Sequence, residues 1–138
     1  MSKTVYIETT IPSSYYDERP EPEMVARRLW TRRWWDEKRR QYSLLTSSAV
    51  IDELRKGAHS YKEGKLALLS VLTLLQNNTE ILEIAGVYVQ RYVMPADPAG
   101  DALHLALSTY YRIDILLSWN CEHLANENKM EHIRRTNA

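Results

Sequence analysis

Thr4-Val5-Tyr6-Ile7-Glu8-Thr9-Thr10 is the stretch of sequence that decides the fold. Its first four residues are β-branched or aromatic and Pro12 follows soon after, which indicates a short buried strand that ends in a turn. Glu8, Thr9 and Thr10 then come directly after the strand. In open parallel sheets, ligands bind outside the carboxyl ends of the strands, so these polar positions are the first place to look for a functional site.

The rest of the chain alternates between short strands and helices. After the first strand, the residue patterns predict strands at 42–46, 79–84 and 114–118. Helices are expected at about 22–42, from Ser47 or Ser48 to Gly57, at about 62–75, from the third strand to about 94, at 101–111 and from 122 to about 135. This alternation predicts an α/β fold, a three-layer α/β/α sandwich around a central parallel sheet of four or five strands.

Length and composition indicate a single globular domain that spans residues 1–138. Apolar residues make up 44% and charged residues 26% of the chain, which does not favour a disordered or fibrous protein. The single cysteine, Cys121, has no partner for an internal disulfide, and the N-terminus lacks the apolar run of a signal peptide, so we expect a cytoplasmic protein. No apolar stretch reaches the roughly 20 residues that span a bilayer, so we expect no membrane segment.

The formal net charge is zero, but the charges are unevenly distributed. Seven basic and only two acidic residues lie between Arg27 and Arg40, within the first predicted helix. Such a segment can form a local phosphate-binding surface, and Arg27 and Arg28 are candidates for contact with a nucleic-acid backbone. The segment also holds three tryptophans, whose helical spacing favours packing or a dimer contact over stacking on bases: Trp30, Trp34 and Trp35.

Acidic or amide side chains occur near the ends of the predicted elements at four places: Glu8, Asp52-Glu53, Asp101 and Asn120. Carboxylates that converge in space repel one another unless a cation neutralises them. Oxygen ligands select Mg²⁺ or Mn²⁺ over zinc, and the four histidines and one cysteine show no zinc-ligand spacing. Mg²⁺ in a carboxylate site activates water and stabilises charge on a phosphate, so phosphodiester hydrolysis is the chemistry that fits.

Four segments of this chain, in order, resemble the motifs of PIN-domain nucleases: Tyr6–Thr10, Ser48–Leu54, Asp101–Ala106 and Leu116–Asn120. The arrangement looks most like that of VapC-type toxins of bacterial toxin–antitoxin systems, and it covers nearly the whole chain. Each segment alone is weakly specific, whereas all four in order are fairly specific. The resemblance implies a PIN-like sandwich and a ribonuclease that uses Mg²⁺ or Mn²⁺, forms a homodimer and is silenced by an antitoxin protein.

Residue by residue, the resemblance implies four catalytic positions, of which the first three bind the metal: Glu8, Glu53, Asp101 and Asn120. Supporting hydroxyl groups fall on Thr10 and Ser118. Glu8 and Asn120 depart from the family, which usually has aspartate at both positions. The extra methylene of Glu8 shifts the carboxylate by about one bond length. The amide of Asn120 removes a negative charge and weakens any second metal site. The chain also ends without the last strand that many relatives carry.

The choice of site residues leaves alternatives open. Asp52 competes with Glu53 as a metal ligand, because periodicity does not choose between adjacent residues. Asp101 is also placed to be an ordinary cap or first-turn residue of its helix. His104 lies one turn further along, where it faces either the substrate, as a binding residue, or the protein interior.

The departures at Glu8 and Asn120 also leave a second function open. A PIN fold with an impaired site would act as an RNA-binding or protein-interaction module instead of a nuclease. A phosphotransferase of the aspartyl-phosphate type is poorly supported, because the Glu8-Thr9-Thr10 segment lacks the nucleophilic aspartate that this chemistry needs.

Overall fold

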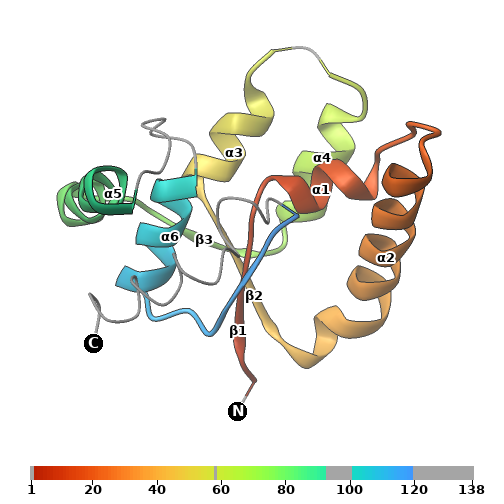
Figure 1. The fold of residues 1–138 in the computed structure, drawn as a ribbon. Coiled ribbons are helices and arrows are strands. Elements are labelled where there is room, and N and C mark those ends of the chain that lie inside the picture. Colours follow the sequence, from red (N-terminus) through yellow and green to blue (C-terminus); the bar gives the residue numbers. More distant parts are fainter. Residues whose placement is uncertain (1, 58, 93–100, 120–138) are drawn as a thin grey trace.

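The computed structural model describes residues 2–57, 59–92 and 101–119, in which a parallel sheet is covered by helices on both faces (Figure 1). β1 (Thr4–Ile7) pairs with β2 (Ser43–Ser47) and with β4 (Ile115–Leu117), and β2 also pairs with β3 (Thr73–Leu75). The strand order is β3-β2-β1-β4, so β1 has a strand on each side. The predicted α/β sandwich with a central four-stranded parallel sheet is confirmed.

Helices connect the strands and form the two outer layers. The chain forms α1 (Thr10–Tyr15), α2 (Pro22–Lys38) and a single 3₁₀ turn, η1 (Arg39–Gln41), between β1 and β2. Next come α3 (Ser48–Arg55) and α4 (Lys62–Leu69), then α5 (Thr79–Tyr92) and α6 (Asp101–Tyr110). Right-handed crossovers that run from β1 to β3 and then return to β4 place the last two helices on the opposite face. Figure 1 shows α5 and α6 across the strands from α1, α2 and α4.

Three of the four strands of this sheet and the helix after β2 lie where the sequence predicts them. β1 has the predicted bounds, and β2 and β4 differ from theirs by one residue at each end. The Ser47 hydroxyl caps α3 by accepting a hydrogen bond from the Val50 N–H at 3.3 Å. Gly57 follows α3 with a φ of 68°, a left-handed conformation that glycine adopts without strain.

Two predictions between residues 62 and 94 are wrong. The strand predicted at 79–84 is the start of α5, and the helix predicted at 62–75 ends at Leu69, before β3. Ile81 and Tyr88 are both buried, and a spacing of seven residues is two helical turns, whereas on a strand it would put them on opposite faces. Asn78 Oδ1 accepts the Ile81 N–H at 2.9 Å at the start of this helix. β3 has only three residues, too few to show a pattern.

Three further differences concern helix bounds. The turn predicted after β1 is the helix α1, and Pro12 lies in its first turn, where a backbone N–H has no partner within the helix. α2 ends at Lys38 and continues as η1, whereas the predicted helix reaches about residue 42. The helix predicted at 122–135 lies outside the described residues.

The core of the described part lies between the sheet and the helices and includes two of the three tryptophans of α2. Trp35 is 1% exposed, and Trp34 stacks on Tyr42 with 5.8 Å between ring centroids. Trp30 is 45% exposed instead. Among the described residues, no helix has the length and apolar character that crossing a membrane requires.

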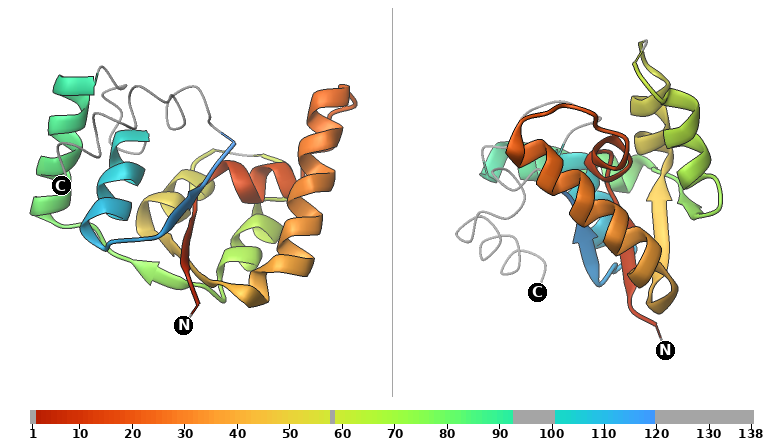
Figure 2. Two further views of the ribbon diagram at one scale, coloured as in Figure 1. Left: turned by 60° about the horizontal axis from the view of Figure 1, so that its bottom comes forward. Right: turned by 90° about the vertical axis from the view of Figure 1, so that its right-hand side faces the viewer.

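The parallel strands end together at one edge of the sheet, as their common direction in Figure 2 shows. Ile7, the last residue of β1, pairs with Leu117, the last residue of β4. The Glu8 N–H also donates to the Leu117 carbonyl at 3.2 Å, which extends the pairing beyond the strand. β2 leads directly into α3 at the same edge. Residues that follow β1, β2 and β4 are therefore neighbours in space.

Candidate functional site

Glu8 is the first residue after β1, and donors from α1 and from the end of β4 hold its carboxylate. Oε1 accepts hydrogen bonds from the Thr10 hydroxyl at 2.6 Å, from the Thr10 N–H at 3.2 Å and from the Ser118 hydroxyl at 2.6 Å. Ser118 lies close to Glu8 because β1 and β4 are paired in register. Glu8 is only 4% exposed, so these donors replace much of the water that a carboxylate otherwise binds.

Glu53 lies on α3 and reaches across to the residue before α1 and to α6. The Thr9 hydroxyl donates to its Oε2 at 2.6 Å, and His104 Nε2 lies 3.0 Å from its Oε1. The Glu53 side chain is 22% exposed, whereas the His104 side chain is 1% exposed. Glu53 therefore lies at the boundary between the protein interior and the solvent, with both carboxylate oxygens in hydrogen bonds.

Glu8, Glu53 and His104 form the acidic cluster, in which one ligand atom of each residue lies within 4.8 Å of the other two. Two carboxylates at this separation repel each other, and a cation between them removes the repulsion. All hydrogen bonds between Glu8 and other described residues use Oε1, which leaves Oε2 for another ligand. Carboxylate oxygens suit Mg²⁺ and Mn²⁺, so the residues present fit a hard divalent cation.

A buried group of polar side chains lies on the sheet side of the acidic cluster. Tyr6 Oη is 2.7 Å from His104 Nδ1 and 2.6 Å from Ser47 Oγ, and both Tyr6 and Ser47 are fully buried. Burial raises the pKa of the Tyr6 hydroxyl well above its ordinary value; the Ser47 hydrogen bond opposes this, and the Glu8 and Glu53 charges add to it. The hydroxyl therefore stays protonated.

Sequence patterns did not indicate Tyr6 as a site residue, and they indicated Thr9 only as one of the polar positions after the first strand, with no role of its own. One signal was available for Tyr6, because a tyrosine within a buried strand needs a hydrogen-bond partner for its hydroxyl. That partner has to come from another element, here His104 of α6 and Ser47 at the end of β2. For Thr9, a hydroxyl beside an expected acid carries no comparable signal.

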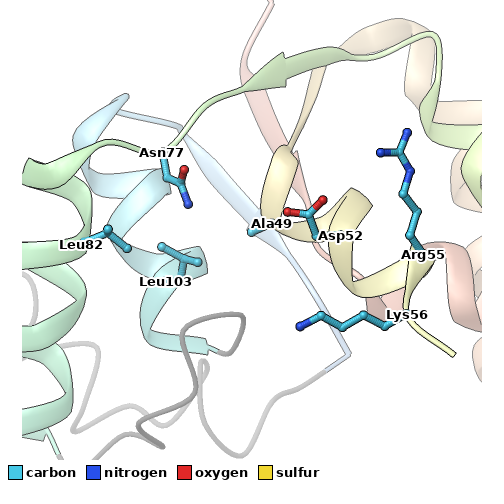
Figure 3. A pocket seen from close by; sticks show the side chains of 7 residues that line it. All are labelled: Ala49, Asp52, Arg55, Lys56, Asn77, Leu82 and Leu103. Atoms are coloured by element: carbon cyan, nitrogen blue, oxygen red, sulfur yellow. The ribbon is translucent and has the colours of Figure 1, made fainter.

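Asp52, the competing candidate, lies on a different side of α3 from Glu53. It lines a separate pocket of about 460 Å³ with six other residues (Figure 3): Ala49, Arg55, Lys56, Asn77, Leu82 and Leu103. Successive residues of a helix are separated by about 100° of rotation, so Asp52 and Glu53 cannot face the same point. The structure brings Glu53 to Glu8 and leaves Asp52 in the pocket.

The other predicted acidic and amide positions are only partly described. α6 begins at Asp101, as predicted, and His104 three residues later reaches Glu53, so the first turn of α6 lies at the acidic cluster. The side chain of Asp101 and the whole of Asn120 lie outside the described residues. Their roles as ligand and catalytic residue stay predictions.

Arg27 and Arg28, the two predicted phosphate contacts on α2, have different neighbours. Arg27 Cζ is 5.3 Å from the centroid of the Trp119 ring, and Arg27 also pairs with Glu23 at 2.7 Å. The backbone N–H of Trp119 donates to the Thr10 hydroxyl at 2.8 Å, which places this residue next to the acidic cluster. Arg28 donates to the Asp17 carbonyl at 3.0 Å and points away from the cluster toward the loop between α1 and α2.

No protein-family model and no curated protein sequence matches the chain. Among solved structures, the chain is similar to Mycobacterium tuberculosis VapC20, which is described as a toxin that cleaves the sarcin–ricin loop. The TM-score is 0.67, and the match covers 89% of this chain and 95% of the mycobacterial protein. Sequence identity is 18%, so the similarity concerns the fold, and it confirms the predicted PIN-like arrangement of the sheet and helices.

Proposed function

We propose that this protein is a metal-dependent ribonuclease that hydrolyses phosphodiester bonds of RNA. The observation that supports this most strongly is the convergence of Glu8 and Glu53 at the carboxyl edge of a PIN-like sheet. Carboxylates this close are stable together when a divalent cation lies between them. The cation would be Mg²⁺ or Mn²⁺, bound by Glu8, by Glu53 and by Asp101 at the start of α6.

The cation, when bound, supplies a water of lowered pKa and stabilises negative charge on the phosphate. The residues of the chain keep the ligands in place. Thr10 and Ser118 donate to one oxygen of Glu8, and Thr9 donates to Glu53. Asn120 follows two residues after Ser118, and in this proposal its amide contacts the water or the phosphate without adding a negative charge.

RNA would approach along the face that joins the acidic cluster to α2. Trp119 is edge-to-face with Trp30 at 5.3 Å between centroids, and Arg27 lies over the Trp119 ring at 5.3 Å. An exposed tryptophan beside arginine suits an unpaired base and its phosphate. In this proposal Trp30 stacks on a base and Arg27 contacts a phosphate, while Arg28 adds positive charge to the same helix.

The cellular role that fits this activity is that of a toxin in a toxin–antitoxin pair. The mycobacterial protein with the same fold is described as a toxin that cleaves the sarcin–ricin loop. A toxic ribonuclease needs a protein inhibitor, so an antitoxin is the expected partner. We further propose a cytoplasmic homodimer, as the sequence resemblance implies.

Cleavage of single-stranded RNA by the purified chain tests the proposal. Activity is expected with Mg²⁺ or Mn²⁺ and none in a chelator. Glu53→Gln should lower the rate by about 100-fold or more, the scale of losing one charged group from an active site. Asp52→Asn makes the same change of charge on the adjacent residue, outside the acidic cluster, and should stay within about twofold of the parent rate.

Two further measurements separate the nuclease from its rival. Asp101→Asn should also abolish cleavage, since Asp101 is a proposed ligand. Mn²⁺ binding by calorimetry should be lost in Glu53→Gln and kept in Asp52→Asn. RNA binding without cleavage, together with no Mn²⁺ binding, would show instead an impaired PIN fold that acts as a binding module.

A further inference from the structure

Four groups form a continuous buried chain of hydrogen bonds behind Glu53. The Val50 N–H donates to Ser47 Oγ at 3.3 Å, Ser47 Oγ is 2.6 Å from Tyr6 Oη, and Tyr6 Oη is 2.7 Å from His104 Nδ1. His104 Nε2 is then 3.0 Å from Glu53 Oε1. The three residues that link Val50 to Glu53 through these hydrogen bonds, Ser47, Tyr6 and His104, are at most 1% exposed. Water therefore does not replace any of these partners.

The protons available on these groups determine which atom donates and which accepts in each hydrogen bond. An ionised Glu53 accepts hydrogen bonds only, so the contact with His104 requires a proton on Nε2. In a neutral ring Nδ1 then has a lone pair and accepts from the Tyr6 hydroxyl, which keeps its proton because burial raises its pKa. The Tyr6 oxygen in turn accepts from the Ser47 hydroxyl, whose oxygen accepts from Val50. In this arrangement every proton of the linked groups has an acceptor.

The opposite direction leaves a proton without an acceptor. A ring protonated at Nδ1 would donate to the Tyr6 oxygen, and Tyr6 would then donate to Ser47. Ser47 Oγ has hydrogen bonds with Tyr6 and Val50 only, as far as the described residues show, and the Val50 partner is itself a donor. The Ser47 hydroxyl proton would then be buried and unpaired, which is costly.

We propose that His104 is a positioning residue for Glu53, through an Nε2–H that donates to the carboxylate and an Nδ1 that accepts from Tyr6, and is neither a metal ligand nor a contact for substrate. The location of His104 suits a positioning residue better than a metal ligand or a substrate contact. The ring is 1% exposed, which keeps it from RNA, and in the inferred state Nε2 carries a proton directed at Glu53, so this nitrogen has no lone pair for a metal. Thr9 occupies the other oxygen of Glu53, so two donors from two elements fix the carboxylate plane.

The consequence for cation binding rests on the proposed function, whereas the direction of the hydrogen bonds does not. A carboxylate that is fixed before the cation arrives loses less freedom on binding, and partners of this kind commonly account for about 10- to 100-fold of metal affinity or activity. Tyr6 and Ser47 act on Glu53 indirectly, because they determine which ring nitrogen of His104 carries the proton. The acidic cluster thereby depends on residues in the interior of the sheet.

The ring state is measured directly by ¹⁵N NMR of the full chain with labelled histidine, with the His104 signals identified by their loss in His104→Gln. We expect a proton on Nε2 and none on Nδ1, both without metal and with saturating Mg²⁺. A proton on Nδ1, protons on both nitrogens at neutral pH, or loss of the Nε2 proton when Mg²⁺ binds would each overturn the proposal.

Substitutions at His104 separate positioning from ligation. Glutamine places an amide N–H near the position of Nε2, whereas asparagine places it near Nδ1. His104→Asn should lower Mn²⁺ affinity, measured by calorimetry, by about 10- to 100-fold, and His104→Gln should recover much of that loss. Equal losses in the two variants would contradict the proposed role.

Tyr6→Phe removes the donor to His104 Nδ1 and has a matched control in the same protein. Tyr88 is also buried, and its hydroxyl is 2.9 Å from the Thr109 hydroxyl, so it joins α5 to the last turn of α6. Tyr6→Phe should alter the His104 ring signals and weaken Mn²⁺ binding by about 10-fold, whereas Tyr88→Phe should change neither. Unchanged His104 signals in Tyr6→Phe would refute the proposed hydrogen bond from Tyr6 to His104 Nδ1.

The two proposals fail in different ways. A chain with the expected ring state but without Mn²⁺ binding or RNA cleavage would refute the ribonuclease and leave the hydrogen-bond direction intact. A chain that cleaves RNA but has the other ring state would refute the positioning role alone.

Discussion

Replacing Glu53 by glutamine is expected to stabilise the metal-free protein while it removes the response to metal. The ligand atoms of Glu8 and Glu53 lie within 4.8 Å of each other. At an effective dielectric constant of about 20, two unit charges at that distance repel by about 3.5 kcal/mol. Glu53 is 22% exposed, so solvent screens part of this repulsion, and glutamine also weakens the hydrogen bonds from Thr9 and His104.

The free energy of unfolding of the metal-free variant is therefore expected to rise by about 1–2 kcal/mol, because each weakened hydrogen bond offsets about 1 kcal/mol of the repulsion that is removed. For a chain of this length, that corresponds to a Tm about 3–6 °C higher. The assay is thermal unfolding in a chelator, followed by circular dichroism. In the parent protein, Mn²⁺ at about 100 times its Kd should add about 2.7 kcal/mol of stability, and in Glu53→Gln it should add little.

Asp52→Asn is the matched control, because it removes the same charge from the adjacent and exposed residue of α3. It should leave both the metal-free Tm and the increase with Mn²⁺ close to those of the parent protein. A lower metal-free Tm in Glu53→Gln, or equal stabilisation of that variant and of Asp52→Asn by Mn²⁺, would refute repulsion between Glu8 and Glu53 that a cation relieves.

Three other substitutions test the surroundings of the site. Trp30→Ala should raise the KM for single-stranded RNA by about 10-fold with kcat little changed, as expected for one lost stacking contact, whereas Leu29→Ala, at a neighbouring exposed position, should not; equal KM values would exclude stacking on Trp30. Ser118→Ala removes a 2.6 Å hydrogen bond to Glu8 and should weaken Mn²⁺ binding by about 10-fold in calorimetry; an unchanged Kd would show that Ser118 does not support the site. The N–H and hydroxyl of Thr4 lower the pKa of Asp114 below 3.8, so its contribution to stability is present above pH 3.8 and is lost as the pH falls through the folded-state pKa. Thermal melts of Asp114→Ala should therefore show a deficit at pH 7 that shrinks in acid, and a deficit independent of pH would argue against this linkage.

The sequence predicted the parts of the fold in which local pattern and burial agree. β1 is a run of β-branched and aromatic residues with both faces covered, and the helix after β2 has a serine cap and a terminal glycine. The region from 70 to 84 was predicted wrongly because its strand, Thr73–Leu75, is short and lies at the edge of the sheet. There, pairing with β2 rather than side-chain alternation decides the structure.

In the candidate site, too, the residues that local sequence indicates were predicted, and the contacts between residues far apart in the sequence were not. Glu8 follows the first strand and the Asp52-Glu53 pair lies in the helix after the second, and the carboxyl ends of parallel strands lie together, so both places were indicated. The family resemblance then assigned Glu53. The choice of Glu53 over Asp52 depends on the rotation of α3, which the Ser47 cap and the packing of the helix determine. His104 and Tyr6 are 98 residues apart, and no local pattern indicates that a tyrosine of the first strand and a histidine of α6 share a hydrogen bond.

Both carboxylates of the acidic cluster depend on β1. Tyr6 and Glu8 are two residues apart in extended chain, so they face the same side of the sheet. Glu8 contributes its own carboxylate, and Tyr6 acts on Glu53 through His104. The separation of the two acids is thus determined largely by a central strand paired on both sides, which resists the repulsion that would otherwise move the carboxylates apart before a cation binds. A long glutamate is suitable after such a strand, because Thr10 and Ser118 restrict the position of its carboxylate, and the departure from aspartate at this position is therefore compatible with a preformed metal site.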